Sequence, residues 1–154
     1  MTEDKTHIRK AGIEDAEAIS ALTDSAYNKY IPLIGRKPQP MTADYAKMVI
    51  ENPIWLLTLK DQLAGILVLT HEADTLLIYS VAIQPEYQKQ GLGRHLLAFA
   101  EEEALRAGYH SIRLYTNELF VDNIRLYKNL GYEVTGREPY LGSTLVHMAK
   151  KLRT

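Results

Sequence analysis

The chain has 154 residues, 46% of them hydrophobic, which suits one globular domain with room for a sizeable core. It has no cysteine, which excludes disulfides, a thiolate nucleophile and a cysteine-based metal site, and no metal is expected. A formal net charge of −1 argues against a nucleic-acid partner, and the lack of a long apolar run or a signal-peptide pattern indicates a cytoplasmic protein with no membrane partner.

Strands and helices alternate along the chain without an internal repeat, which predicts a single α/β unit. Three prolines and a glycine fall within residues 31–41, so we expect that segment to be irregular. Thr42 is a plausible N-cap for the helix that follows, and Asp61 and Gln62 form the expected tight turn of a hairpin. The predicted elements, in chain order, are a strand near 6–10, helices over about 13–27 and 42–52, strands near 54–60, 63–71 and 75–83, a helix over about 92–107, a strand near 111–116, a helix over about 122–130, and strands near 133–136 and 144–151.

The most informative segment joins the strand that ends before Pro85 to the helix that begins near Leu92. It reads Gln-Lys-Gln-Gly-Leu-Gly-Arg over residues 88–94. Gly91 and Gly93 have no Cβ, so backbone N–H groups at the helix start can approach an anion closely. The helix dipole adds ~0.3–1 kcal/mol of attraction. The segment therefore predicts a site for a phosphorylated cofactor.

Two common phosphate-binding motifs do not fit this turn. A P-loop needs Lys and then Ser or Thr after its second glycine, where this chain has Arg94 and His95. The dinucleotide fingerprint needs a third glycine at the position of Leu96. What remains is Gln-x-x-Gly-x-Gly after a strand that ends in Val-x-Ile-x-Pro. This pattern resembles the acetyl-coenzyme A motif of the GNAT superfamily of N-acetyltransferases.

The resemblance extends over nearly the whole chain. Residues 114–117, Leu-Tyr-Thr-Asn, look like the family's fifth strand, and residues 123–132 look like its next helix, ending in Leu-Tyr-x-x-x-Gly-aromatic. Residues 8–15 resemble the first strand and the start of the first helix. One departure is Phe120, which stands where the commoner pattern has an Asn seven residues before the helix Tyr. Asn123 is the candidate to take over that contact.

The resemblance implies one N-acetyltransferase domain over residues 1–154. Its expected fold is a mixed, mostly antiparallel twisted sheet flanked by helices, with splayed central strands. Its expected function is transfer of an acetyl group from acetyl-CoA to a small-molecule amine by direct attack, with no acyl-enzyme. Two alternatives stay open: an acetyltransferase that acts on a protein N-terminus or lysine, and a non-catalytic module that binds or senses acyl-CoA.

The splayed strands imply how coenzyme A is held. Main-chain groups near Val81 and Ile83 are expected to hydrogen-bond the pantetheine arm as an added strand would. Gln88 either holds the turn or meets a phosphate, and Lys89 and Arg94 are either phosphate contacts or ordinary exposed surface. The residues implied for coenzyme A are Val81, Ala82, Ile83, Gln88, Lys89, Gln90, Gly91, Leu92, Gly93, Arg94, Asn117 and Asn123.

Tyr127 is the expected proton donor. When an amine attacks the acetyl thioester, the leaving thiolate must gain a proton, and a phenol that donates to the sulfur accelerates this by roughly 10²–10⁴-fold. The alternative is a core tyrosine that packs under Ile124 and Leu130. The Leu-Tyr-x-x-x-Gly-aromatic context favours the catalytic role.

The attacking amine must also lose a proton, which requires a base or a water chain. Tyr79 ranks first as the second catalytic residue. It lies two residues before Val81, which predicts the same face of the strand and a position in the acceptor cleft. The other candidates near this strand are His71, Glu72 and Asp74, and Asn117 is a candidate to orient a water.

Acceptor identity is expected to depend on the first two helices and the loop between them. The candidate acceptor-binding residues there are Tyr27, Tyr30, Arg36 and Lys37. Arg36 and Lys37 either pair with a carboxylate or phosphate on the acceptor or form an exposed basic pair. The last strands, with Arg137, Tyr140 and His147, contribute either to the same cleft or to a homodimer contact.

Overall fold

One sheet organises the computed structural model, which describes residues 6–153. Its strand order is β1-β2-β3-β4-β5-β7-β6, and β4 and β5 form its parallel pair while the other neighbours are antiparallel. The expected mixed, mostly antiparallel sheet is therefore confirmed. The strands are β1 (Thr6–Lys10), β2 (Ile54–Leu59), β3 (Gln62–His71), β4 (Leu76–Ile83), β5 (Ser111–Asn117), β6 (Glu133–Tyr140) and β7 (Ser143–Lys151).

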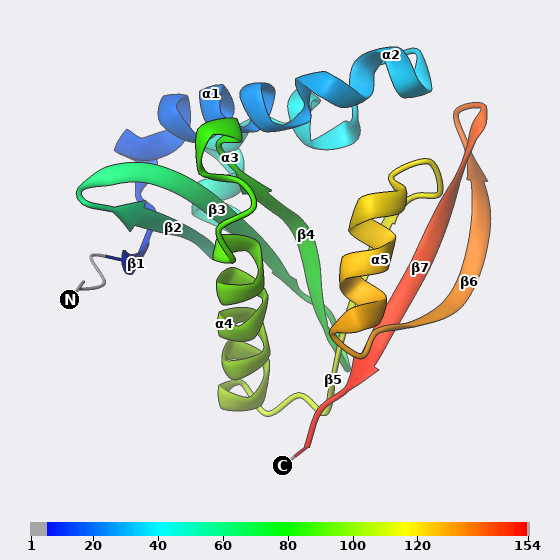
Figure 1. The fold of residues 1–154 in the computed structure, drawn as a ribbon. Coiled ribbons are helices and arrows are strands. Elements are labelled where there is room, and N and C mark those ends of the chain that lie inside the picture. The colour runs from blue at the N-terminus through cyan, green and yellow to red at the C-terminus, as the bar shows by residue number, and fades with distance from the viewer. Residues whose placement is uncertain (1–5, 154) are drawn as a thin grey trace.

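Helices cover both faces of this sheet (Figure 1). They are α1 (Ala16–Tyr27), α2 (Ile31–Ile34), α3 (Tyr45–Glu51), α4 (Leu92–Arg106) and α5 (Val121–Asn129), with 3₁₀ turns at Ile13–Asp15, Asn28–Tyr30, Gln39–Thr42 and Pro85–Tyr87. Side chains alternate between the two faces along each strand. In β3, Ile66 and Val68 join the core under α1 and α3, whereas Leu67 and Leu69 join the core under α4.

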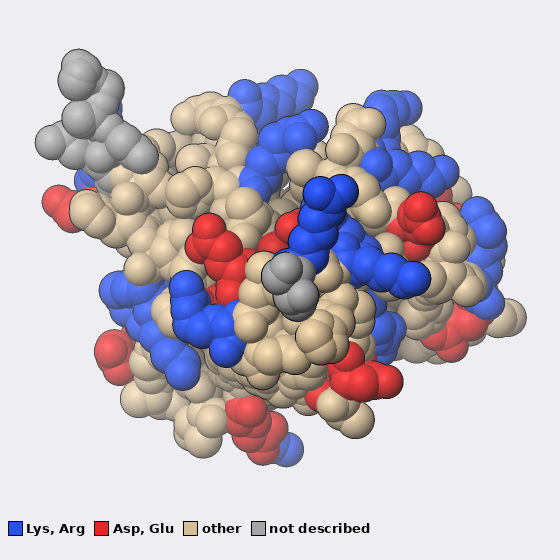
Figure 2. Space-filling view, turned by 90° about the horizontal axis from the view of Figure 1, so that it is seen from below, with Lys and Arg blue, Asp and Glu red and all other residues tan. Residues whose placement is uncertain are grey.

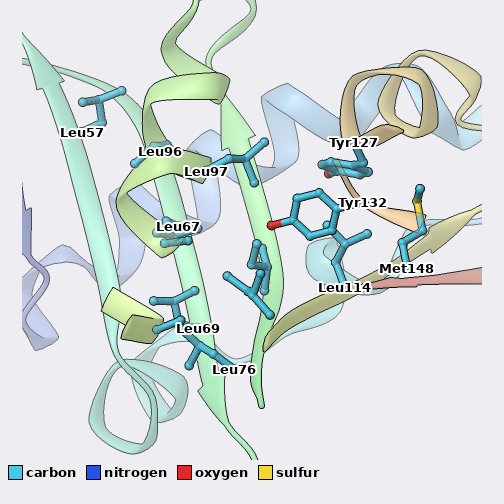
Figure 3. Packing of buried hydrophobic residues seen from close by; sticks show 14 of the residues in the cluster. Leu57, Leu67, Leu69, Leu76, Leu96, Leu97, Leu114, Tyr127, Tyr132 and Met148 are labelled. Atoms are coloured by element: carbon cyan, nitrogen blue, oxygen red, sulfur yellow. The ribbon is translucent and has the colours of Figure 1, made fainter. Parts of the chain in front are cut away.

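The core under α4 continues across the sheet to α5. Figure 3 shows Leu96 and Leu97 of α4 on one side and Tyr127, Tyr132 and Leu114 on the other. α4 buries an apolar stripe against this core, because the stripe's members recur on one face of the helix. The buried stripe residues are Leu96, Leu97, Ala100 and Ala104.

The prediction that residues 31–41 are irregular was wrong. The segment forms the single turn α2 and begins a 3₁₀ turn at Gln39. Pro32 stands in the first turn of α2, where no intrahelical partner exists for the missing N–H, so the proline fits. Gly35, with a φ of 76°, ends α2 in the left-handed conformation.

The proposed cap of the next helix was also wrong. Thr42 lies in the 3₁₀ turn, where its Oγ1 donates to the Gln39 carbonyl at 2.8 Å. Asp44 caps α3 instead, because its carboxylate accepts from the Lys47 backbone N–H at 3.2 Å. The helix therefore begins three residues later than expected.

The C-terminal hairpin is longer than predicted. β6 continues to Tyr140 and includes Pro139, which a strand tolerates here because β6 lies at the edge of the sheet. Leu141 and Gly142 form the turn, with φ values of 48° and 77°. The hairpin extends beyond the rest of the sheet toward α2 (Figure 1).

Charges are mixed on the face shown in Figure 2, where acidic and basic side chains intersperse without a field of one sign. Within residues 6–153, no helix has both the length and the apolar character needed to cross a membrane.

Candidate active site

The central strands of the sheet separate at the candidate site. β4 and β5 pair at only three positions, from Leu76 with Ile112 to Ile78 with Leu114. Beyond these pairs β4 continues to Ile83 and β5 to Asn117, and Figure 1 shows the two halves of the sheet diverging like a V. The expected splay is confirmed, and it leaves main-chain groups on both strands without a strand partner.

A bulge in β4 begins where the splay begins. Val68 pairs with Ser80 and Leu69 pairs with Ile78, so Tyr79 is the extra residue. Tyr79 consequently packs toward α1 and α3, whereas Val81 packs toward α4. The expectation that Tyr79 and Val81 share a face was wrong, because the bulge shifts the alternation by one residue.

A groove of about 330 Å³ lies between the end of β4 and the start of α4. We call it the glycine-turn groove. Gly91 takes a φ of 82° and no side chain caps α4, so the first N–H groups of that helix have no partner within the helix or from a cap. A Cβ at Gly91 or Gly93 would meet no atom within 4 Å, which shows open space on the groove side. The predicted residues that line it are Val81, Ala82, Ile83, Gln88, Lys89, Gly91, Leu92, Gly93, Arg94 and Asn123.

Two residues predicted for this groove lie elsewhere. Gln90 is exposed and its Nε2 lies 3.5 Å from the Glu86 carbonyl. Asn117 is buried, its Nδ2 donates to Ser143 Oγ at 2.7 Å, and its Oδ1 accepts from the Leu119 N–H at 3.0 Å. Gln88 holds the turn, because its Nε2 donates to the Ile83 carbonyl at 3.0 Å.

A second, smaller cavity of about 70 Å³ lies between the splayed strands, α1 and the segment that follows α2. We call it the tyrosine cavity. Arg36 is the charged residue of its lining, and Ser80, Asn117 and Gln39 add neutral polar groups. No Asp, Glu or His among residues 6–153 lines it. Its five tyrosines are Tyr27, Tyr79, Tyr115, Tyr127 and Tyr140.

The groove and the cavity meet at a few shared residues, which are Tyr27, Val81, Asn123 and Tyr127. Tyr127 projects from α5, and its ring lies 5.9 Å from that of Tyr132 (Figure 3). Burial raises the pKa of Tyr127 above its ordinary value, and the neighbouring tyrosines add to this. No hydrogen bond to its hydroxyl is found in the described part of the chain, and the residue is only 8% exposed. That hydroxyl is free to donate to a ligand at the junction.

This geometry agrees with the match of residues 19–132 to the Acetyltransferase (GNAT) family. The chain belongs to that family. Probable N-acetyltransferase 14 of Xenopus tropicalis is 34% identical over 104 residues, 66% of this chain, which spans about half of that relative's length (50%). The [ribosomal protein bS18]-alanine N-acetyltransferase of Escherichia coli K12 is 32% identical over 89 residues, 57% of this chain and 60% of that relative. A PaiA N-acetyltransferase from Thermoplasma acidophilum, solved in complex with coenzyme A, has a TM-score of 0.80 at 19% identity over 95% of this chain and 98% of that one, which shows the same fold.

The acceptor residues expected for this GNAT chain separate in the structure. Tyr27 lies at the junction and its hydroxyl is 3.1 Å from Ser80 Oγ, while burial raises its pKa to about 12. Tyr30 lines the glycine-turn groove instead and stacks on Phe120 at 4.0 Å. Arg36 lines the tyrosine cavity, but Lys37 is exposed and lines neither space.

Three of the base candidates lie outside both spaces. His71 Nδ1 lies 3.0 Å from the Tyr109 hydroxyl, and Glu72 accepts two bonds from Arg113 at 2.7 and 2.8 Å. Asp74 is exposed on the same loop. Tyr79 does line the tyrosine cavity, but burial raises its pKa to about 12, so its phenolate is rare near neutral pH.

Sequence reasoning missed Tyr115 as a cavity residue. Its signal was available, because the two-residue period of a strand places Tyr115 and Asn117 on one face. Tyr140 was among the candidates of the last strands, and it lines the cavity from the end of β6, which is longer than predicted.

Proposed function

We propose that this GNAT chain transfers an acetyl group from acetyl-CoA to a small-molecule amine. The observation that carries the proposal is the junction at Val81 and Tyr127, where the glycine-turn groove opens into the tyrosine cavity. One space offers a place for a phosphorylated cofactor and the other a place for its acceptor. The cofactor itself is supported by the coenzyme A complex of the Thermoplasma neighbour.

The groove has the features that coenzyme A requires. Unpartnered N–H groups at the start of α4, together with Lys89 and Arg94, suit a pyrophosphate. The backbone of β4 near Val81 has no strand partner on the side of β5, which suits the amide groups of a pantetheine arm that would add as a strand. The groove volume of about 330 Å³ falls in the range of small-molecule sites.

The residues at the junction supply the acid–base chemistry. When bound, acetyl-CoA would supply an acetyl thioester: as the acceptor nitrogen bonds to the carbonyl carbon and the C–S bond breaks, the nitrogen gives up one proton and the thiolate gains one, which leaves an amide and a free thiol. Tyr127 holds a hydroxyl proton at that point. Because burial raises its pKa, Tyr127 stays protonated and acts as a hydrogen-bond donor to the developing thiolate.

The tyrosine cavity selects the neutral form of the amine. Its lining, as far as residues 6–153 show it, contains no carboxylate or imidazole to accept a proton, and Arg36 disfavours a second cation there. The acceptor therefore gives up its extra proton to solvent before it attacks. Tyr79 contacts the acceptor rather than serving as its base.

A second candidate function is acetylation of a protein N-terminus. It is favoured by the Escherichia coli relative, whose name states action on an alanine of ribosomal protein bS18. The cavity volume of about 70 Å³ favours the small amine, because a narrow cavity admits a small group more readily than a chain end with its flanking residues. A non-catalytic acyl-CoA module is the remaining alternative.

Thiol release tests these functions directly. The protein is mixed with acetyl-CoA and a panel of small amines, peptides with a free N-terminus and lysine peptides, and free thiol is followed with a dye. We expect thiol release that depends on a small amine, with one acetyl group added to it by mass spectrometry. Release with peptides alone would favour the protein substrate. Coenzyme A binding by calorimetry without release for any acceptor would favour the non-catalytic module.

A further inference from the structure

Arg36 is an isolated cation in the wall of the tyrosine cavity. Its Nε is buried without a hydrogen-bond partner, and Nη1 makes only a long 3.5 Å contact with the Lys37 carbonyl. No ion pair joins Arg36 to a carboxylate in the part of the chain that the structure describes. Buried donors are nearly always paired in folded proteins, so the orphaned Nε of Arg36 beside a cavity indicates a missing partner.

The surroundings of Arg36 favour an anionic partner. The guanidinium carbon lies over the Tyr140 ring, 5.3 Å from its centroid, which holds the planar group in place without using its N–H groups. The rest of the lining is neutral, so a negative group that enters the cavity meets one positive charge and no repulsion.

The position of Arg36 relative to the junction defines the acceptor further. Tyr127 and Val81 line both spaces, whereas Arg36 and Tyr140 line only the tyrosine cavity. An acceptor whose amine reaches Tyr127 therefore has its other groups near Arg36. We infer that the acceptor is a small molecule that carries a carboxylate as well as the amine, and that Arg36 binds this carboxylate. This inference rests on the proposed function.

A carboxylate fits this place better than a phosphate. The cavity of about 70 Å³ favours the smaller, planar group. A guanidinium edge binds a carboxylate through two parallel N–H···O bonds, which a lysine cannot imitate. The acceptor class is then an amino acid or a related amino carboxylate.

Matched acceptors test this inference. The proteinogenic amino acids and β-alanine are each compared with their carboxamides, with initial rates expressed per neutral amine. We expect at least tenfold higher kcat/KM for the preferred carboxylate than for its carboxamide. We expect Arg36→Ala to raise KM for the carboxylate at least tenfold, to leave KM for the carboxamide within twofold, and to change kcat less than threefold.

Lys37→Ala is the matched control, since it removes the same charge one residue further along, from a side chain outside both spaces. It is expected to leave every KM within twofold. Arg36→Lys keeps the charge without the planar fork and is expected to recover only part of the affinity. A second readout without turnover is calorimetric binding of the preferred amino carboxylate to the protein saturated with coenzyme A, which Arg36→Ala should weaken at least tenfold.

Three results would overturn the inference. Equal kcat/KM for carboxylate and carboxamide acceptors, or turnover of simple amines alone, would show that the acceptor needs no carboxylate. Either result would leave the proposed function intact. A rise in KM for both acceptor types with a lower melting temperature in Arg36→Ala and Arg36→Lys would assign Arg36 to holding the segment after α2. Calorimetric binding of the amino carboxylate that is unchanged in Arg36→Ala would also overturn the inference, because Arg36 would then not bind the carboxylate. Absence of thiol release with every acceptor would instead contradict the proposed function, and calorimetry with each amino carboxylate of the panel, on the parent and on Arg36→Ala, would then decide the role of Arg36 alone.

Discussion

Tyr127 combines a free hydroxyl with a buried ring. Burial raises the pKa of this phenol, so near neutral pH it cannot leave a full proton on a thiolate of reference pKa ~8.5 without cost. It can donate a hydrogen bond while negative charge develops on the sulfur. Its contribution is therefore made to the transition state and should appear in kcat rather than in cofactor affinity.

The change Tyr127→Phe removes only this hydroxyl and keeps the ring in the core. We expect kcat to fall about 10- to 10⁴-fold while the Kd for acetyl-CoA stays within twofold. Steady-state kinetics and calorimetry measure the two effects. Turnover within twofold of the parent, on an acceptor whose chemical step limits the rate, would leave Tyr127 as a packing residue.

The pH profile should follow the acceptor rather than the protein. Burial raises the pKa of Tyr27 and of Tyr79 to about 12, so both phenols stay protonated from pH 6 to 10. A raised tyrosine pKa moves the titration of that tyrosine above this window, so the fraction of neutral amine sets the rate. We therefore expect kcat/KM to rise tenfold per pH unit until the pH reaches the pKa of the acceptor amine. Two acceptors with amine pKa values of about 8 and about 10 should therefore show midpoints about two units apart. A shared midpoint would indicate a protein base.

Tyr79 also shows what sequence reasoning can and cannot supply at a single residue. It lines the tyrosine cavity, but the face of β4 that carries it differs from the one that strand alternation predicts. Strand alternation holds only while the ladder is regular, and a bulge depends on the pairing with β3, which local spacing does not encode.

At the scale of elements, the turn between β4 and α4 is the part that the sequence predicts best. Glycine spacing and helix periodicity are local properties, and both survive in the structure at Gly91, Gly93 and α4. The 31–41 segment shows the opposite. Pro32 would break a helix interior but fits the first turn of a helix, and α2 is a single turn that ends at Gly35 in the left-handed conformation.

Gly93→Val tests the turn as an anion site. A Cβ at this position meets no protein atom within 4 Å, so the folded protein should accommodate the change, whereas a pyrophosphate at the N–H groups should not. We expect the Kd for acetyl-CoA to rise at least tenfold, about 1.4 kcal/mol, with a melting temperature near that of the parent.

Gly136→Val in β6 is the control for that change. It adds the same side chain at another glycine with open space, away from the groove. Calorimetry should show parent-like affinity for this variant. Equal affinities for Gly93→Val and the parent would contradict the phosphate role of the turn.

At the scale of the whole molecule, the site depends on two sheet halves that part at one place. The splay was expected only from the family resemblance, because the residues of β4 and β5 by themselves indicate ordinary apolar strands. A long-range ion pair that no local sequence pattern predicts adds to the backbone pairing at the closed end: Glu72, after β3, binds Arg113 of β5 through both carboxylate oxygens at 2.7 and 2.8 Å. The pair spans β4 and closes the V at its base.

Glu72→Gln should loosen this closed end. The pair is about 30% exposed on each side, so solvent screens it, and we expect a loss of roughly 1 kcal/mol in the free energy of unfolding near pH 7. Asp74→Asn is the control, because it makes the same charge change on the same loop at a side chain with no ion pair within residues 6–153. Urea unfolding measures both.

The pH dependence of that loss identifies the ion pair as its cause. The Arg113 side chain lowers the pKa of Glu72 below its ordinary 4.5, first through the hydrogen bonds and then through charge. A lowered carboxylate pKa stabilises the folded state above pH 4.5, and this stabilisation disappears as pH falls through the folded pKa. Unfolding curves of the parent and Glu72→Gln should therefore differ at pH 7 and converge as the pH falls from 4.5 through the folded pKa. A difference that stays constant over this range would mean that Glu72 acts through packing rather than through its charge.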